Sequence, residues 1–353
     1  MVNPLVLGFF WILIAALAGG AFGLQYRIMR QYQVENASFL SVFVATVPIP
    51  LIACSILLPG WTEAISKAGL ASNATIFFFG FCWGMGAITY AYGFNLLGMA
   101  LAASLLKGIS IAIGAGVPLV RHWEQVSVPA RATTIAGLAI LMVGTAVAGK
   151  AGIMREKEAK KDSDTPLLHP KTNPKPSGRL FWVGFILCLI SGFASSGANL
   201  GYDRADVIEN AMVEISHGAD LTWKATLVRW MPMYWGGITA LLIFMGGAML
   251  IRGTWRCYFA KGSRRDFLVS SSMGVVHFMA QIPYGIGAFY LGRLGTTIGW
   301  GANIGMALIV ASGLGFLTGE WKGASKTTTH MLYYAIAILI GAIVVLASAN
   351  TLA

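Results

Sequence analysis

Charged residues are scarce in this chain of 353 residues. Asp, Glu, Lys and Arg make up 11% of it, whereas a typical soluble domain contains about 25%. Hydrophobic residues make up 56%, and the mean hydropathy is +0.70. This balance excludes an ordinary soluble enzyme, a disordered chain and a nucleic-acid-binding protein. It predicts an all-α protein that crosses a membrane many times.

Motifs for nucleotide and metal chemistry are also missing from the sequence. The chain has no GxxxxGK[ST] loop, no HExxH and no paired-cysteine motif, which disfavours ATP-driven transport by this chain alone. Its four cysteines lack the spacing of a metal site or a disulfide framework, and we interpret them as packing residues. We therefore expect no catalytic residues, no metal and no cofactor.

Runs of apolar residues predict ten transmembrane helices, because a helix needs about 20 such residues to span a bilayer. The predicted spans are Leu5–Leu24, Ala37–Leu58, Ala74–Leu96, Met99–Val120, Ala132–Ala148, Leu180–Leu200, Leu221–Leu250, Phe267–Leu291, Leu294–Phe316 and Thr328–Ser348. The seventh is long enough to be tilted or to extend beyond the membrane. After the sixth, the polar segment Asp203–Asp220 could form a short amphipathic helix.

Twelve of the charged residues lie between Lys150 and Arg179. This segment divides the chain into a first half (1–149), a charged cytoplasmic linker (150–179) and a second half (180–353). Five predicted spans lie on each side of it. An odd number of spans per half makes the two halves inverted repeats in the membrane, which is a common architecture of secondary transporters.

The positive charges predict the orientation of the chain. Loops that follow odd-numbered spans contain 17 Lys and Arg residues, and loops that follow even-numbered spans contain 5. Cytoplasmic loops carry the excess of Lys and Arg. Both termini should therefore lie outside the cytoplasm, and the net charge of +11 reflects membrane orientation rather than binding to nucleic acid.

Acidic residues are absent from the middle of every predicted span. Membrane-embedded titratable groups often carry proton coupling. The candidates for that role are therefore His277 in the eighth span, Lys107 about eight residues into the fourth, and Asp203 at the end of the sixth. Lys107 has no acidic neighbour in sequence, so it could bind substrate, take part in coupling or extend to the interface.

Polar side chains in the eighth span are spaced to share one helical face. His277, Gln281 and Tyr284 follow each other at i, i+4 and i+7, beside Pro283, which can interrupt the hydrogen bonds of the helix. This face could line a sugar-sized cavity, or it could form hydrogen bonds that join helices.

The ninth span repeats this spacing with Thr296, Trp300 and Asn303. An indole beside an amide could stack on a sugar ring and hydrogen-bond to it, or could serve packing alone. Further candidates for a substrate-binding cavity lie in the third, fourth and sixth spans: Trp83, Tyr90, Lys107 and Asn199.

Several short patches occur in order along nearly the whole chain. They are Phe79-Gly80 through Trp83-Gly84-x-Gly86-x3-Tyr90, Leu97-Gly98-Met99, Gly149-Lys150-Ala151-Gly152, Ser191-Gly192 with Ser195 to Asn199, Gln281 with Tyr284-Gly285-x-Gly287, Trp300, and Gly319-Glu320-Trp321-Lys322-Gly323-x-Ser325. With these patches the chain resembles the L-rhamnose–proton symporter family of the drug/metabolite transporter superfamily. The resemblance implies ten helices in two inverted five-helix repeats, and uptake of a deoxy sugar with a proton.

The chain departs from the pattern of that family at a few positions. Gln25 stands where the family tends to have a Pro, His277 where it tends to have a Trp, and Asn303 where it tends to have a His. Lys107 replaces a small or apolar residue. These positions fall on the faces expected to line the cavity, and a Lys there would suit an acidic sugar or another anion.

The sequence therefore predicts a secondary transporter in the bacterial inner membrane, with periplasmic termini. It would take up a small sugar, L-rhamnose or a related deoxy or acidic sugar, by alternating access and with proton symport. Its partners would be the sugar, the proton and membrane lipid, with no nucleic acid. Two alternatives stay open: an exporter of drugs or metabolites from the same superfamily, and a membrane sensor or enzyme subunit.

Overall fold

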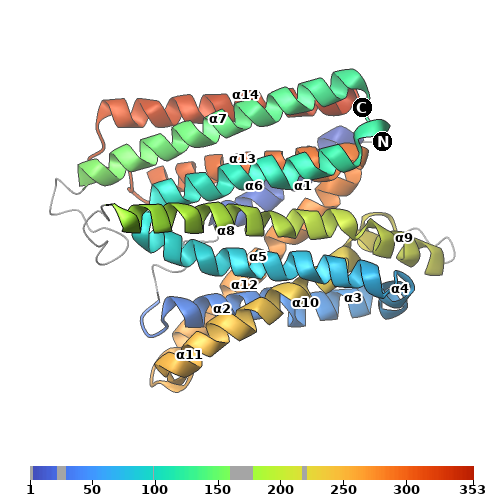
Figure 1. Cartoon of the computed structure of the whole chain (residues 1–353), viewed down its shortest axis with the longest axis horizontal. Coiled ribbons are helices and arrows are strands. Elements are labelled where there is room, and N and C mark those ends of the chain that lie inside the picture. Colours follow the sequence, from blue (N-terminus) through green and yellow to red (C-terminus); the bar gives the residue numbers. More distant parts are fainter. Residues whose placement is uncertain (1–2, 22–28, 98, 160–177, 217–220) are drawn as a thin grey trace.

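The computed structural model describes residues 3–21, 29–97, 99–159, 178–216 and 221–353, and these residues form a bundle of long helices without strands (Figure 1). The longer helices are α1 (Pro4–Ala21), α2 (Val34–Thr46), α3 (Pro48–Leu57), α5 (Leu70–Leu97), α6 (Met99–Arg121), α7 (Val128–Ala159), α8 (Arg179–Arg204), α10 (Trp230–Leu241), α12 (Ser263–Tyr290), α13 (Gly295–Leu317) and α14 (Lys326–Thr351). The shorter ones include α4 (Trp61–Lys67), α9 (Asp206–Ile215), the 3-10 helix η3 (Thr222–Arg229) and α11 (Gly247–Arg252).

Nine helical segments within the described residues are long and apolar enough to cross a membrane, so the chain is a polytopic membrane protein. They correspond to nine of the ten predicted spans. The remaining one, the eighth predicted span Phe267–Leu291, corresponds to α12, which carries several serines together with His277 and Gln281. With 28 residues, α12 is about 42 Å long, which exceeds the hydrocarbon thickness of about 30 Å.

Helix α7 is longer than the sequence predicts. It continues past Ala148 to Ala159 and so takes up the start of the predicted linker. Lys and Glu are good helix formers, and the Oε1 atom of Glu156 accepts a hydrogen bond from the backbone N–H of Ala100 at 2.9 Å. The rest of the linker lies outside the described residues up to 177.

The predicted seventh span is built from several short helical segments. The chain runs from η3 into α10, then through a π-helical turn at Leu242–Gly246 into α11. The segment before it contains α9, as expected for a short helix between Asp203 and Asp220. The long seventh span is therefore a succession of 3-10, α and π helical segments rather than one regular α-helix.

The helices pack in pairs that cross the two halves of the chain. Helix α5 packs along α8, and α1 along α12; α10 packs on α5, and α2 on α12. Helix α6 contacts α8 and α13, α13 also contacts α1, and α7 and α14 form a pair at one edge (Figure 1). A Cβ on Gly80 would lie 1.9 Å from the carbonyl oxygen of Met233, so bare glycine backbone allows α5 and α10 to touch.

The two ends of the bundle differ in the elements that they contain. At one end α6, α8 and α12 finish and α13 begins, and the labels of both chain termini lie there with α9 (Figure 1). We call this the Arg121 end. The opposite end, where α12 begins and α7 finishes, we call the Asp266 end.

Candidate functional site

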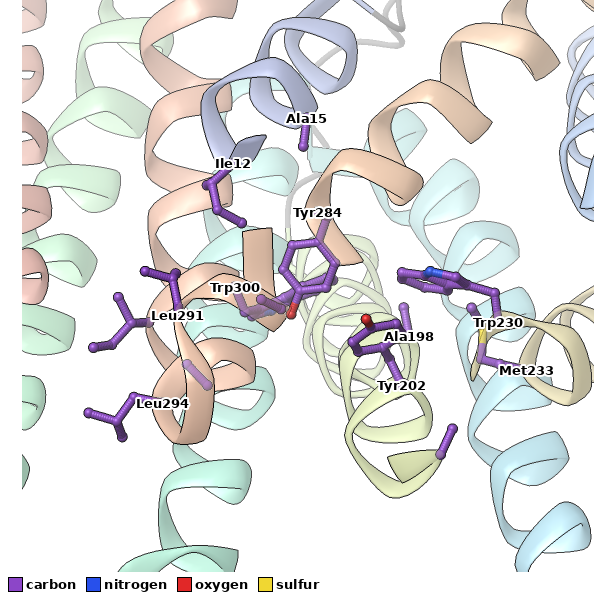
Figure 2. Close-up of a cluster of buried hydrophobic side chains, with 14 of the residues drawn as sticks. Ile12, Ala15, Ala198, Tyr202, Trp230, Met233, Tyr284, Leu291, Leu294 and Trp300 are labelled. Carbon is purple, nitrogen blue, oxygen red and sulfur yellow. The ribbon is translucent and has the colours of Figure 1, made fainter. Parts of the chain in front are cut away.

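Aromatic side chains fill the interior next to the Arg121 end. The ring centroid of Tyr202 lies 4.5 Å from that of Trp230 and 5.7 Å from that of Tyr284. The ring of Trp300 lies 5.6 Å from Tyr284 on its other side, as Figure 2 shows. All four side chains are buried. We call these four residues the aromatic plug.

Asn199 of α8 ties the plug to three other helices. Its Nδ2 atom donates to the carbonyl oxygens of Gly114 in α6 at 2.6 Å and of Thr296 in α13 at 2.8 Å. Its Oδ1 atom accepts a hydrogen bond from the hydroxyl of Tyr284 in α12. The structure thus brings together two residues that the sequence predicted for the cavity, and both amide hydrogens of Asn199 serve contacts between helices in this conformation.

Trp300 is also used for packing between helices. Its indole N–H donates to the carbonyl oxygen of Ser110 at 3.0 Å, and a Cβ on Gly114 would lie 2.4 Å from the same nitrogen. Glycine at position 114 therefore makes room for the indole between α6 and α13.

An ion-pair cluster closes the Arg121 end above the plug. The Nη1 atom of Arg121 lies 2.8 Å from the Oδ2 atom of Asp203, and its Nη2 atom lies 2.8 Å from Asp206. The hydroxyl of Thr296 donates to the Oδ1 atom of Asp203 at 2.7 Å, and the Nε2 atom of His122 lies 3.3 Å from the same oxygen. Asp203 is 4% exposed, so this carboxylate is a buried junction between α6, α8 and α13.

A second ion pair lies beside this cluster. Arg229 at the end of η3 pairs with Glu209 of α9, and its guanidinium carbon lies 5.0 Å from the ring centroid of Tyr202. The cation–π contact and the ion pair join the polar cluster to the aromatic plug.

A cavity of about 240 Å³ lies at this end of the bundle. Its lining residues are His122, Tyr202, Asp203, Asp206, Thr226, Arg229, Ala288, Phe289, Gly292, Arg293 and Thr296. Its volume corresponds to about eight water molecules at 30 Å³ each, slightly below the usual range for drug-sized ligands. Because Arg293 is exposed, the cavity reaches the surface.

Trp83 and His277 meet on the Asp266 side of the plug. Their ring centroids lie 5.7 Å apart with an interplanar angle of 31°, and both side chains are half-buried. Gln281, one turn further along α12, is also half-buried. The sequence-predicted face of α12 thus runs from His277 to the buried Tyr284 of the plug.

Lys107 and Asn303 occupy the same level of the bundle. Lys107 lies one turn before Ser110 in α6 and Asn303 one turn after Trp300 in α13, while Ser110 and Trp300 are in contact. Both side chains are half-buried. Among the described residues, the Lys107 amine has no ion pair or hydrogen bond, and the Oδ1 atom of Asn303 has no hydrogen-bond partner.

Two predicted positions cannot be placed in this way. Tyr90 belongs to α5, but its side chain lies outside the described residues, as does Gln25 altogether. The sequence does not reveal the partners of Asp203. In sequence Arg121 is a loop charge at the end of the fourth predicted span, and Asp203 lies at the end of the sixth; that both spans end on opposite charges is a usable signal.

At the Asp266 end a single carboxylate binds the backbone that leads into α2. Asp266 accepts hydrogen bonds from the backbone N–H groups of Arg30, Gln31 and Tyr32, at 2.9 Å for the first and last. Burial raises the pKa of this carboxyl, but the three donors and the nearby Arg265 lower its pKa by more, so that it lies below the ordinary value. Asp266 lies just before the expected span. Its hydrogen bonds attach the first turn of α12 to the backbone at Arg30–Tyr32.

Long apolar helices around a polar and aromatic interior define a multi-pass membrane protein of the transporter class. A family model described as L-rhamnose-proton symport protein matches residues 1–352, and the chain belongs to this family. The L-rhamnose-proton symporter of Citrobacter koseri is 22% identical over 368 residues, which cover 99% of this chain and 98% of the relative. Those of Pectobacterium atrosepticum and Yersinia pestis are 23% and 22% identical over the same shares.

Proposed function

We propose that this protein is a secondary active transporter that takes up L-rhamnose, or a related deoxy or acidic sugar, together with a proton. The family and the names of the relatives support a sugar–proton symporter. One observation carries the proposal most directly. Half-buried polar and aromatic side chains lie deep in the bundle, directly beside a plug that is closed by ion pairs.

We further propose that the described helices form ten spans in two inverted repeats, 1–149 and 180–353, joined by the linker 150–179. The pairing of helices supports this arrangement. The contact of α1 with α12 corresponds to that of α8 with α5, and the contact of α2 with α12 to that of α10 with α5. The contact of α13 with α1 corresponds in turn to that of α6 with α8. Inverted repeats give alternating access by rocking around a central site.

The excess of Lys and Arg in alternate loops supports an orientation with both termini in the periplasm of a bacterial inner membrane. The Arg121 end would then face the outside. In this conformation the plug and the ion pairs separate the centre of the bundle from the outside.

The central site would use Lys107 and Asn303, whose polar atoms lack hydrogen-bond partners among the described residues, together with the ring of Trp83. Trp83 would stack on the sugar ring, while Lys107 and Asn303 would bind its polar or acidic groups. The full set proposed for the substrate is Trp83, Tyr90, Lys107, Asn199, Gln281, Tyr284, Trp300 and Asn303. His277, Lys107 and Asp203 are the groups proposed for proton coupling.

Uptake by purified protein in proteoliposomes tests the proposal. L-rhamnose and a panel of neutral and acidic sugars are offered with an imposed pH gradient, acidic outside. The account expects accumulation of at least one sugar above its external concentration, abolished by a protonophore. If no sugar accumulates under any gradient, the proposed function is wrong.

A further inference from the structure

We infer that the corner between α11 and α12 is a binding surface for anionic phospholipid of the cytoplasmic leaflet. We call residues 250–265 the basic corner. The choice of leaflet rests on the proposed orientation, in which the Asp266 end faces the cytoplasm, whereas the binding itself does not depend on transport. Bound lipid would hold the ends of α2 and α12 at the membrane surface.

The basic corner concentrates exposed positive charge. Its five cationic residues, all exposed, are Arg252, Arg256, Lys261, Arg264 and Arg265. The one acidic residue between 250 and 268 is Asp266, which is buried and bound by backbone N–H groups. The half-buried Glu35 of α2 lies 3.5 Å from Arg252. The other four cations form no ion pair with the described residues, so their charge is available to an anion.

Large apolar side chains are exposed among these charges. Leu250 and Ile251 at the end of α11 are 71% and 88% exposed, and Trp255 and Phe259 of the 3-10 helix η5 (Thr254–Phe259) are 41% and 81% exposed. The apolar span ends at Arg252, so η5 lies beyond it. Lys and Arg between exposed aromatic and aliphatic side chains are typical of elements that lie in the interface of a bilayer.

The path of the chain places the basic corner at the side of the bundle. Gly253 and Gly262 have φ angles of 70° and 91°, which glycine adopts without steric cost. The chain therefore turns sharply out of α11 and again into α12. Figure 1 shows α11 running at an angle to the neighbouring helices at the edge of the bundle. Lipid headgroups would meet the corner in this position.

Hydrogen bonds attach the basic corner to the two helices behind it. The hydroxyl of Tyr258 donates to the carbonyl oxygen of Asn36 in α2 at 2.9 Å, and the Nδ2 atom of Asn36 donates to the carbonyl oxygen of Thr254 at 3.0 Å. The hydroxyl of Ser263, in the first turn of α12, donates to the carbonyl oxygen of Tyr258 at 2.9 Å. Lipid bound at the corner would therefore act on α2 and on α12, which carries part of the proposed sugar site.

The chemistry of the corner selects an anionic phospholipid as its partner. Each Lys or Arg near an anionic membrane surface strengthens the association by about fivefold. A phosphate ion would satisfy the cations but not the exposed apolar side chains. A zwitterionic lipid would cover the apolar side chains but offers no net charge. An anionic phospholipid matches both features.

The turn between α13 and α14 provides a contrast at the same end of the bundle. Lys322 and Lys326 are exposed there. Acidic groups lie beside them, because Glu158 accepts a hydrogen bond from the hydroxyl of Ser325 at 2.7 Å and Glu320 lies two residues before Lys322. This turn should therefore attract anionic lipid less than the basic corner does.

Thermal unfolding of the full-length protein in mild detergent, titrated with phosphatidylglycerol, tests the inference. A ligand that binds the folded state raises the melting temperature. We expect phosphatidylglycerol to raise it, phosphatidylcholine with the same acyl chains to raise it much less, and added salt to weaken the effect. Inorganic phosphate alone should not reproduce it.

A variant with Arg256→Gln, Lys261→Gln and Arg264→Gln removes three exposed cations of the corner. The concentration of phosphatidylglycerol that gives the half-maximal effect should rise more than about tenfold. The matched control combines Arg179→Gln, Lys322→Gln and Lys326→Gln, which removes three exposed cations at the same end but outside the corner. This control should respond to the lipid as the wild type does.

A second variant, Phe259→Gln, leaves every charge in place and removes an exposed apolar contact. It keeps the test decisive if the triple variant of the corner does not fold. We expect it to raise the half-maximal concentration of phosphatidylglycerol several-fold. An unchanged value would contradict a membrane surface as the partner.

The outcomes separate this inference from the proposed function. Equal stabilisation by phosphatidylcholine or by inorganic phosphate overturns the inference, as does an equal response of the two triple variants. A protein that binds phosphatidylglycerol as expected but accumulates no sugar contradicts the proposed function alone. A protein that accumulates sugar but is not stabilised by phosphatidylglycerol contradicts this inference alone.

Discussion

The aromatic plug and the residues just inward of it form two neighbouring layers that differ in how their polar atoms are used. In the plug, the hydroxyl of Tyr284 donates to Asn199 beside it and Trp300 donates to Ser110, whereas the indole N–H of Trp230 has no partner among the described residues. In the inner layer, Asn303 and Lys107 lack such partners among the described residues. Polar groups at membrane depth are costly. The hydrogen bonds of Asn199, Tyr284 and Trp300 between helices therefore stabilise the fold, and the unbonded polar groups of Lys107 and Asn303 indicate a place for a ligand.

This contrast separates residues that the sequence predicts together as one cavity lining. It predicts that substitutions in the plug change stability more than affinity, and that substitutions in the inner layer do the reverse. The predictions that follow test this separation.

The largest effect is expected for Lys107→Ala. Losing a charge-assisted contact with the solute should cost about 2 kcal/mol, or about thirtyfold in KM, and more for an acidic sugar than for L-rhamnose. The melting temperature in detergent should not fall, since the amine has no partner to lose. Uptake kinetics measure the effect, and unchanged transport would place Lys107 outside the cavity.

Asn199→Ala should give the opposite result. It removes three hydrogen bonds between helices, and at about 0.6 kcal/mol each the free energy of unfolding should fall by about 1.8 kcal/mol. Thermal unfolding in detergent measures this loss. Asn303→Ala is the matched control in the inner layer, and an equal loss of stability in both would remove the distinction between the layers.

Trp83→Ala should weaken sugar binding by about 1 kcal/mol, about fivefold in KM, through loss of an aromatic face. Trp83→Phe retains a ring and should recover most of the affinity. Equal KM values for the wild type and both variants would argue that Trp83 serves only to pack against His277.

An effect on stability alone, with none on sugar affinity, is expected at the Asp266 end, far from both layers. Because the pKa of Asp266 is lowered in the folded protein, its contribution to stability is present above the ordinary Asp value of about 3.9 and is lost as the pH falls below it. Asp266→Asn should lower the free energy of unfolding at neutral pH by about 1 kcal/mol. It should also flatten the dependence of the melting temperature on acidic pH; an unchanged dependence would contradict this.

Composition and periodicity were sufficient to predict an all-helical membrane protein, and the face of α12 that contains His277, Gln281 and Tyr284. They could not predict that Asn199 bonds to Tyr284, because pairs between helices depend on packing that no local spacing reveals. For the same reason the sequence does not reveal the ion pair of Arg121, whose partner Asp203 lies in another helix. The sequence places the end of the fifth span at Ala148, but α7 continues to Ala159. Charged residues mark where a span leaves the membrane, and they do not end the helix itself.

The central claim, coupled inward movement of sugar and proton, is tested most directly without any imposed gradient. L-rhamnose is added to weakly buffered proteoliposomes that contain the wild-type protein, and the external pH is recorded. The account predicts that the external medium becomes more alkaline as protons enter with the sugar, and that L-rhamnose is needed for the change. An acidification, or sugar entry without any change in pH, would contradict it.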